Sequence, residues 1–187
     1  MGCKYTFVNF VELSTEELLL VFNWRNNVEV RKWMYSTDLV DLDSHFNFVK
    51  KLENDKSKLY FLVKRNDTPI GTFSLTAIEN NEAEWGYYVS PDYHHKNLGV
   101  EFYYYALEFV YSVLKIQNLK GYVLVENKAA NSFSDLFGFT KEISEEMSLA
   151  NNDKYFFREM SDNVWKDKVL SNKKIDRLLQ LTNNEII

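Results

Sequence analysis

The chain has 187 residues and a net charge of −5 at pH 7, and 45% of its residues are hydrophobic. This length supports one good hydrophobic core and is short for two, so we expect a single domain. The net negative charge argues against a surface that binds nucleic acid or anionic membranes, because such surfaces need clustered Lys and Arg. The single cysteine, Cys3, excludes an internal disulfide, and no apolar run reaches the roughly 18 residues of a membrane span. These features predict a cytoplasmic protein that binds neither nucleic acid nor membranes.

The first part of the chain predicts a strand and then a broken helical region. The segment 4–13 alternates between apolar and polar side chains and is rich in aromatic and β-branched residues, which is typical of a strand. Ser14 and Glu17 have the spacing of a capping box, which predicts a helix that runs to about Trp24. After the Asn26-Asn27 pair, the sequence indicates a break and a short second helix.

The next segment predicts a third helix and a meander of strands. Asp43 or Ser44 can cap the helix, which carries an apolar stripe over about 45–52. Turns rich in Asn and Asp then separate three runs. Their residues either alternate between apolar and polar or are rich in aromatic and β-branched side chains. These runs predict antiparallel strands over residues 59–64, 70–78 and 82–89.

A loop after the third of these strands leads into a helix that begins at Gly99 and ends near residue 114. Its N-terminus presents unpaired N–H groups and a favourable dipole, so the loop predicts a site for a phosphate or pyrophosphate. Asn127 then caps a helix that ends at Gly138, where a left-handed residue is expected. Further strands are predicted over residues 120–126, 139–143 and 154–160.

Beyond residue 160 the composition changes to a charged, amphipathic pattern that predicts one or two helices. We therefore divide the chain into a domain over 1–160 and a helical C-terminal extension of the same domain over 161–187. The sequence does not determine what this extension does.

The order of strand, phosphate-binding loop, helix, strand and Asn-capped helix resembles the acetyl-coenzyme A dependent N-acetyltransferases of the GNAT superfamily. In that family an Asn is followed by an Ala three residues later and by a Gly-Phe pair eleven residues later, as Asn127, Ala130 and Gly138-Phe139 are here. The family's loop pattern falls on 94–99, where His94 and Asn97 replace the usual first residue and first glycine. The resemblance implies an α+β fold with a central, mostly antiparallel sheet flanked by helices.

The same resemblance implies acetyl-CoA as co-substrate. The N–H groups of 96–100 would bind its pyrophosphate, the strand end at Val89 would pair with the pantetheine arm, and Asn127 would contact that arm while also capping its helix. The implied cofactor-binding residues are Val89, His94, Lys96, Asn97, Leu98, Gly99, Val100 and Asn127. We expect no metal, because the three histidines lack the spacing of metal ligands.

The chemistry of the family requires a base for the amine and stabilisation of the departing thiolate. Glu84 lies two residues before Gly86, where related enzymes place a carboxylate base, although it can instead be a solvated strand residue. Seven residues after Asn127 the family usually has a Tyr that protonates the thiolate, and this chain has Ser134. Ser134 is either a helix-surface residue or a hydrogen-bond donor to the sulfur. The proton would then come from the ammonium intermediate or from another tyrosine such as Tyr88.

The N-terminal region narrows the resemblance to the nucleotide-sugar N-acetyltransferases of the pseudaminic acid pathway. These enzymes acetylate the 4-amino group of UDP-4-amino-4,6-dideoxy-N-acetyl-β-L-altrosamine and serve the glycosylation of flagellin or surface polysaccharide. The resemblance rests on residues 24–26 and 33–37 and implies that Arg25 pairs with the diphosphate. The implied substrate-binding residues are Arg25, Met34, Tyr35, His45 and Phe48. Without the resemblance, such aromatic residues are usually core and such an arginine is usually solvated.

The sequence therefore predicts transfer of an acetyl group from acetyl-CoA to an amino group on a UDP-linked deoxy sugar. The first alternative is an acetyltransferase that acts on a protein or peptide N-terminus. The second is an acyl-CoA-binding GNAT module without catalysis, which the departures at Asn97 and Ser134 allow. A homodimer is left open.

Overall fold

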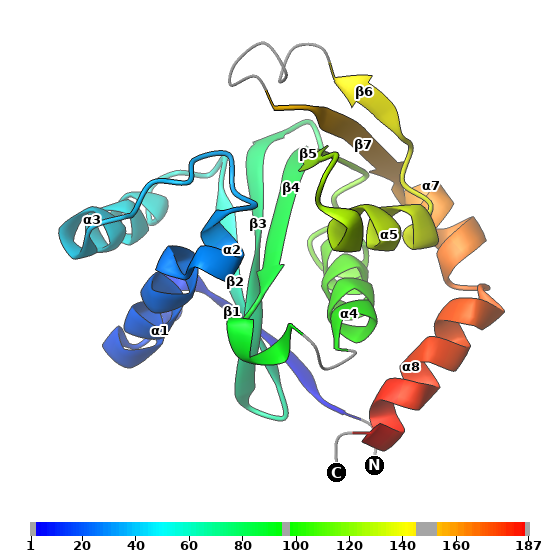
Figure 1. The fold of residues 1–187 in the computed structure, drawn as a ribbon, viewed down its shortest axis with the longest axis horizontal. Helices are drawn as coiled ribbons and strands as arrows, with labels where there is room; N and C mark the ends of the chain where they lie inside the picture. The colour runs from blue at the N-terminus through cyan, green and yellow to red at the C-terminus, as the bar shows by residue number, and fades with distance from the viewer. Residues whose placement is uncertain (1–2, 95–97, 145–152, 186–187) are drawn as a thin grey trace. The chain divides into compact units, whose positions relative to one another are not determined.

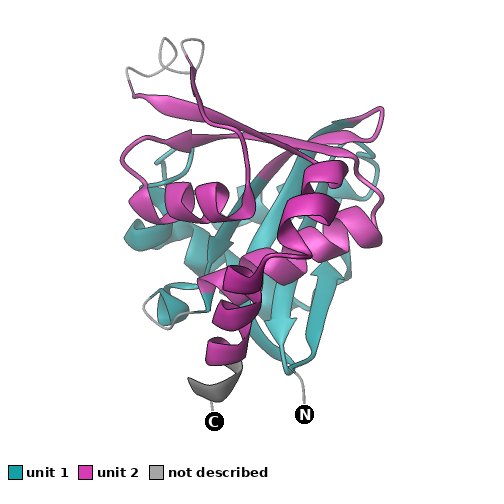
Figure 2. Ribbon diagram, turned by 90° about the vertical axis from the view of Figure 1, so that its right-hand side faces the viewer, with its two compact units in different colours: residues 1–78, 86–98 teal, residues 79–85, 99–187 magenta. Residues whose placement is uncertain are grey.

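The computed structural model describes residues 3–94, 98–144 and 153–185 (Figure 1). The chain forms two compact units: unit 1 comprises residues 1–78 and 86–98, and unit 2 comprises residues 79–85 and 99–187 (Figure 2). The boundary divides strand β4, Glu82–Val89, between its fourth and fifth residues. The predicted boundary at residue 160 is a different division of the chain and stays a prediction.

In its described residues, unit 1 combines strands with α-helices and short 3₁₀ helices. Strand β2 pairs antiparallel with both β1 and β3. The elements of this unit are β1 Tyr5–Asn9, η1 Phe10–Glu12, α1 Thr15–Asn26, α2 Val28–Arg31, α3 Leu42–Leu52, β2 Leu59–Arg65, β3 Thr68–Glu79 without its last residue, the second half of β4 and η2 Pro91–Tyr93. Asn66 and Asp67 have φ of 47° and 64°, as a tight hairpin turn between β2 and β3 requires. The core joins α1 and α3 to the sheet through Leu18, Val21, Trp24, Val49, Leu52 and Leu62.

Unit 2 contains the first half of β4, three further strands and the remaining helices. Its elements are α4 Gly99–Ser112, β5 Asn118–Leu124, α5 Lys128–Phe137, β6 Glu142–Ser144, β7 Tyr155–Ser161, α7 Asp162–Val164, the π-helical turn η3 Trp165–Val169 and α8 Lys173–Glu185. Trp165 is 1% exposed and stacks on Tyr111 of α4, with ring centroids 5.8 Å apart. The aromatic contact therefore attaches the start of the C-terminal helical segment to α4.

The strands follow the order β1-β2-β3-β4-β5-β7-β6. Strands β4 and β5 pair in parallel over Glu82–Glu84 and Asn118–Lys120, whereas β7 pairs antiparallel with both β5 and β6. The predicted α+β class, with a mostly antiparallel sheet flanked by helices and a helical C-terminus, is confirmed, and the parallel pairing of β4 with β5 makes the sheet mixed. Among the residues described, no helix is both long and apolar enough to cross a membrane.

Two local predictions are wrong. Strand β1 ends at Asn9 instead of continuing to residue 13, because the Asn9 side chain accepts a hydrogen bond from Val11 N and starts a 3₁₀ turn. Helix α3 is capped by Asp41, not by Asp43 or Ser44. The Asp41 carboxylate accepts from Ser44 N at 2.8 Å, so Ser44 already lies in the first turn.

Candidate active site

Helix α5 begins with a cap that leaves one polar group available. The Asn127 Oδ1 accepts a hydrogen bond from Ala130 N at 3.1 Å, and Gly138 ends the helix with a φ of 84°. No acceptor for the Asn127 Nδ2 lies among the residues that the structure describes. The side chain can therefore cap the helix and donate a hydrogen bond to a ligand at the same time.

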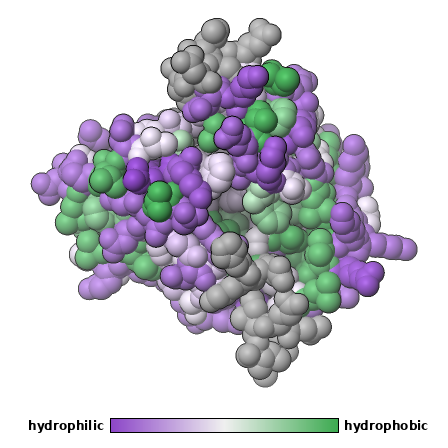
Figure 3. All heavy atoms as spheres, in the orientation of Figure 1, coloured by the Kyte–Doolittle hydropathy of each residue, from purple (hydrophilic) through white to green (hydrophobic). Residues whose placement is uncertain are grey.

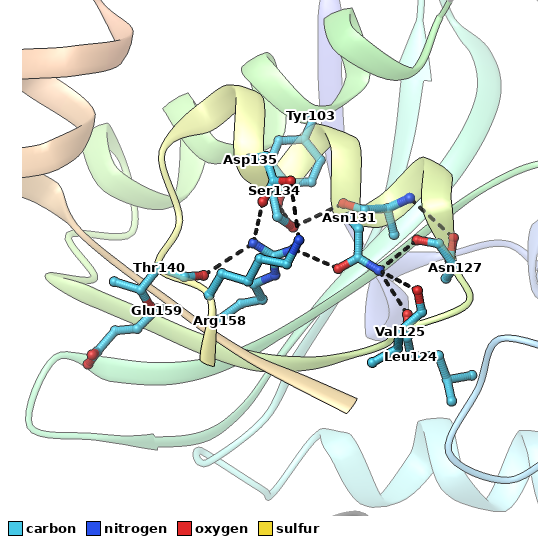
Figure 4. A network of polar contacts seen from close by, with 12 residues as sticks. Tyr103, Leu124, Val125, Asn127, Asn131, Ser134, Asp135, Thr140, Arg158 and Glu159 are labelled. Atoms are coloured by element: carbon cyan, nitrogen blue, oxygen red, sulfur yellow. Dashed lines mark hydrogen bonds and ion pairs between the residues drawn. The ribbon is translucent and has the colours of Figure 1, made fainter. Parts of the chain in front are cut away.

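Ser134 lies about two turns after Asn127 in α5 and faces inward. Its side chain is 2% exposed, so the reading of Ser134 as a helix-surface residue is wrong. Its hydroxyl donates to the Ala130 carbonyl at 3.0 Å and lies 3.5 Å from the Tyr103 hydroxyl of α4 (Figure 4). Burial raises the pKa of Tyr103 well above its ordinary value, and the hydrogen bond with Ser134 only partly offsets this. Tyr103 is therefore a neutral hydroxyl at physiological pH.

A buried arginine holds α5 against β7. Arg158 of β7 is 2% exposed and donates to the Asn131 Oδ1 at 2.6 Å, to the Asp135 carboxylate and to the Thr140 carbonyl (Figure 4). Asn131 in turn donates from its Nδ2 to the carbonyls of Leu124 and Asn127, each at 2.9 Å. The network therefore connects the end of β5, the cap of α5 and the turn that carries Ser134.

Glu84 lies on β4, in register with Lys120 of β5. Its neighbours Ala83 and Trp85 are 0% and 8% exposed, so the side chains alternate as predicted and Glu84 points to the opposite face. Glu84 is half-buried. Gly121 of β5 allows the two strands to approach, because a Cβ at this position would lie 2.8 Å from the Trp85 carbonyl oxygen.

The phosphate-binding loop is only partly described. His95, Lys96 and Asn97 lie outside the described residues. The His94 ring donates from Nε2 to the Val89 carbonyl at 2.9 Å, so the two predicted cofactor contacts bond to each other. Leu98 is 1% exposed, so its side chain is not available to a cofactor.

The first residue of α4 lies close to a side chain of α5. A Cβ at Gly99 would lie 2.5 Å from the ring of Phe133, so this ring would have to shift to admit a larger residue. Val100, the next residue, is half-buried. Both residues lie at the helix N-terminus, where the predicted pyrophosphate contact would be made by backbone N–H groups.

The predicted substrate residues all lie in unit 1. The Arg25 Nη2 donates to the Ser36 carbonyl at 2.9 Å. Burial and the positive charge of Arg31 lower the pKa of Arg25, against the opposite effects of Tyr88 and Asp38. Burial raises the pKa of Tyr88 to about 12, while a hydrogen bond with Thr72 and the charge of Arg25 act in the other direction. Arg25 and Tyr88 therefore interact within one unit.

The other four predicted residues differ in exposure. Tyr35 is 50% exposed and Met34 is half-buried, and both lie in the segment after α2. Phe48 packs edge-on against Tyr60, with centroids 5.0 Å apart. His45 is 6% exposed, donates to the Leu18 carbonyl at 3.1 Å and has a pKa that burial lowers, so it joins α3 to α1. Apolar and hydrophilic residues are interspersed on the face seen in Figure 3.

Comparison with known proteins identifies the family. The model of the acetyltransferase (GNAT) domain matches residues 8–140, which is more than half of the chain. The chain belongs to the GNAT acetyltransferase family. A curated relative, acetyltransferase PseH of Campylobacter jejuni, is 34% identical over 122 residues, which are 65% of this chain and 76% of that protein.

Two solved GNAT structures give the same fold. The N-acetyltransferase PseH of Campylobacter jejuni in complex with acetyl coenzyme A has a TM-score of 0.68 and 26% identity, over 84% of this chain and 99% of that one. Spermidine N-acetyltransferase of Vibrio cholerae, in complex with CoA and spermine, has a TM-score of 0.76 over 87% of this chain and 98% of that one. At 18% identity the second comparison shows the fold alone.

The predicted GNAT family and the predicted class, an acetyl-CoA-dependent N-acetyltransferase, are therefore confirmed. The roles of individual GNAT site residues stay predictions. Two residues that the sequence did not single out interact with predicted site residues: the Tyr103 hydroxyl lies 3.5 Å from that of Ser134, and the charge of Arg31 acts on Arg25. Tyr103 lies on the helix after the loop and Arg31 lies between residues 24–26 and 33–37, but the spacing of neither residue distinguishes it. Within the described ranges, no group of three or more His, Cys, Asp or Glu side chains could hold a metal ion.

Proposed function

We propose that this enzyme transfers the acetyl group of acetyl-CoA to the 4-amino group of a UDP-linked 4-amino-4,6-dideoxy sugar, as in pseudaminic acid biosynthesis. The observation that carries the proposal is the 34% identity to PseH over 122 residues. The geometry of Arg25 agrees with it, because its buried Nη1 has no acceptor among the described residues and a phosphate oxygen would satisfy this donor.

Acetyl-CoA would bind through backbone groups. We infer that the N–H groups of 96–100 hold the pyrophosphate and that the Asn127 Nδ2 donates to a carbonyl of the pantetheine arm. The Val89 carbonyl is the natural acceptor for a pantetheine N–H, and His94 now donates to it. Cofactor binding at this strand end would therefore require the His94 ring to move away or to share the carbonyl.

The sugar nucleotide would bind in unit 1. Arg25 would bind the diphosphate, while Met34, Tyr35 and Phe48 would provide apolar surface for the 6-methyl group of the sugar. His45 would take part only through Nδ1, because its Nε2 donates to the Leu18 carbonyl. The apolar surface would favour a 6-deoxy sugar over one with a 6-hydroxyl, since a hydroxyl without a partner is costly to desolvate.

The reaction would be a direct attack of the neutral amine on the thioester carbonyl. Glu84 would first take a proton from the ammonium form of the substrate, and collapse of the tetrahedral intermediate that the neutral amine forms would release coenzyme A as a thiolate. Ser134 would turn its single hydroxyl proton from the Ala130 carbonyl to that sulfur while accepting a hydrogen bond from Tyr103. Because burial raises the pKa of Tyr103, it would act as a hydrogen-bond donor and not as the proton source. The thiolate would then take its proton from the ammonium intermediate, with Tyr88 as the alternative donor.

The Tyr103–Ser134 pair can be tested with two hydroxyl deletions. We expect Ser134→Ala to lower kcat by about tenfold, because it removes the hydroxyl that would face the sulfur, and Tyr103→Phe by about threefold, because it removes the hydrogen bond that Ser134 receives. The double variant should lose no more than Ser134→Ala, since Tyr103 acts only through Ser134. Tyr104→Phe is the matched control and should keep kcat. Equal kcat values for Tyr103→Phe and Tyr104→Phe would remove Tyr103 from the reaction.

Two other functions remain to be separated by experiment. An acetyltransferase for protein or peptide N-termini would have the same fold and co-substrate, and an acyl-CoA-binding module without catalysis would keep only the cofactor site. A homodimer stays a prediction for each of them.

The deciding experiment measures cofactor binding and then turnover. Acetyl-CoA at about 100 times its Kd should raise the melting temperature by roughly 5–10 °C. Coenzyme A release should then be fast with UDP-linked 4-amino-4,6-dideoxy sugars and slow with peptide amines or spermidine. A preference for peptides would refute the substrate assignment, and stabilisation without any turnover would favour the binding module.

A further inference from the structure

Two arginines of unit 1 hold adjacent residues of the same loop. Arg25, in the last turn of α1, donates from Nη2 to the Ser36 carbonyl at 2.9 Å. Arg31, the last residue of α2, donates from Nη1 to the Thr37 carbonyl at 2.7 Å. The two guanidinium groups therefore approach one short stretch of backbone from two helices.

The break between the helices creates this arrangement. Residues six apart in a continuous α-helix point about 120° away from each other, so Arg25 and Arg31 would not share a face. The Asn27 side chain instead accepts from Glu29 N at 2.9 Å and starts α2 in a new direction. Asn26 fixes the far end of the loop, because its side chain exchanges two hydrogen bonds of 2.9 Å with the Val40 backbone.

Both arginines carry a buried donor that no described residue satisfies. The Arg25 Nη1 and the Arg31 Nε are inaccessible to solvent and have no acceptor in the described part of the chain. Neither residue forms an ion pair with a described carboxylate, although Asp38 is near enough to affect Arg25. Two cations without a paired carboxylate repel each other, and unsatisfied buried N–H groups add a further cost. An anion with two or more charges would remove both costs.

We infer that Arg31 is a second diphosphate ligand, which forms with Arg25 a two-arginine clamp for the substrate. Each guanidinium can bind phosphate oxygens as a planar fork, so two of them match the two phosphates of a nucleoside diphosphate better than one does. The assignment of this anion to the sugar nucleotide rests on the proposed function. Coenzyme A also carries a diphosphate, so the two sources must be separated.

The test measures binding of UDP and UMP in the presence of saturating coenzyme A, which occupies the cofactor site. Arg31→Gln should weaken UDP binding by at least about tenfold and UMP binding by much less, because a charge-assisted contact to one phosphate is lost. Lys32→Gln is the matched control: it removes the same charge from the next residue, which is exposed and paired with Glu29. It should leave the affinity for UDP unchanged.

A second variant separates binding from support of the loop. Arg31→Lys keeps the charge but loses the fork, so its UDP affinity should lie between those of the wild type and Arg31→Gln. Unchanged UDP affinity in Arg31→Gln would overturn the inference, and so would an equal loss of affinity for coenzyme A. If Arg31→Gln loses affinity for UDP but the wild-type enzyme acetylates no UDP-linked amino sugar, the two-arginine clamp would stand and the proposed function would be refuted.

Discussion

Replacing Arg158 by methionine will lower the free energy of unfolding by about 3 kcal/mol. The substitution removes three hydrogen bonds from a side chain that is 2% exposed. It also leaves the Asn131 Oδ1 without its donor in a residue that is 6% exposed. A buried acceptor that loses its partner costs about 1–3 kcal/mol, and each lost hydrogen bond adds to this. The melting temperature should fall by roughly 6–12 °C.

Lys141→Met is the control for this prediction. Lys141 lies 3.8 Å from the same Asp135 carboxylate, but its side chain is 46% exposed, so the ion pair is screened by solvent. Its removal should change stability by no more than about 0.5 kcal/mol. Similar melting temperatures for the two variants would show that the Arg158 network contributes little to stability.

The Arg158→Met substitution should also affect the cofactor site. Asn131 holds the carbonyl of Asn127 at 2.9 Å, and Arg158 holds Asn131. Loss of Arg158 should loosen the cap of α5 and raise the KM for acetyl-CoA at temperatures where the variant is still folded. A positioning role of this kind is separate from any contact with the cofactor.

The features that could be predicted from the sequence are those that depend on a few neighbouring residues. The Ser14–Glu17 capping box, the Asn127 cap and the left-handed Gly138 need only residues within one or two turns of each other. Side chains of those types have one favourable local partner, so their spacing is informative. The order of strands and helices follows from the same local signals.

The missed features depend on residues that are far apart in the chain. Arg158 and Asn131 are 27 positions apart, and Tyr103 and Ser134 are 31 positions apart. Neither pairing can be read from spacing, because the register of β7 and the packing of α4 on α5 place the partners together. For the same reason the sequence left open whether Ser134 faces solvent, which the structure decides by burying it.

The effect on the reaction itself should be largest at Glu84. If this carboxylate removes the proton from the amine, Glu84→Gln will lower kcat by roughly 100-fold, since a positioned general base contributes about 10²–10⁴-fold. Glutamine keeps the shape and the hydrogen-bonding capacity of the side chain but cannot accept the proton at neutral pH. The KM for acetyl-CoA should therefore change little.

The pH profile distinguishes a base from a residue that only supports the strand. Removal of a general base should change the shape of the kcat/KM profile against pH, whereas loss of a supporting residue should lower the whole profile without changing its shape. Glu82→Gln is the matched control, because Glu82 lies on the same face of β4 but is exposed and accepts a hydrogen bond from Asn118 at 3.2 Å. It should keep both the rate and the profile. A Glu84→Gln enzyme whose profile kept the wild-type shape would assign the proton transfer to another group.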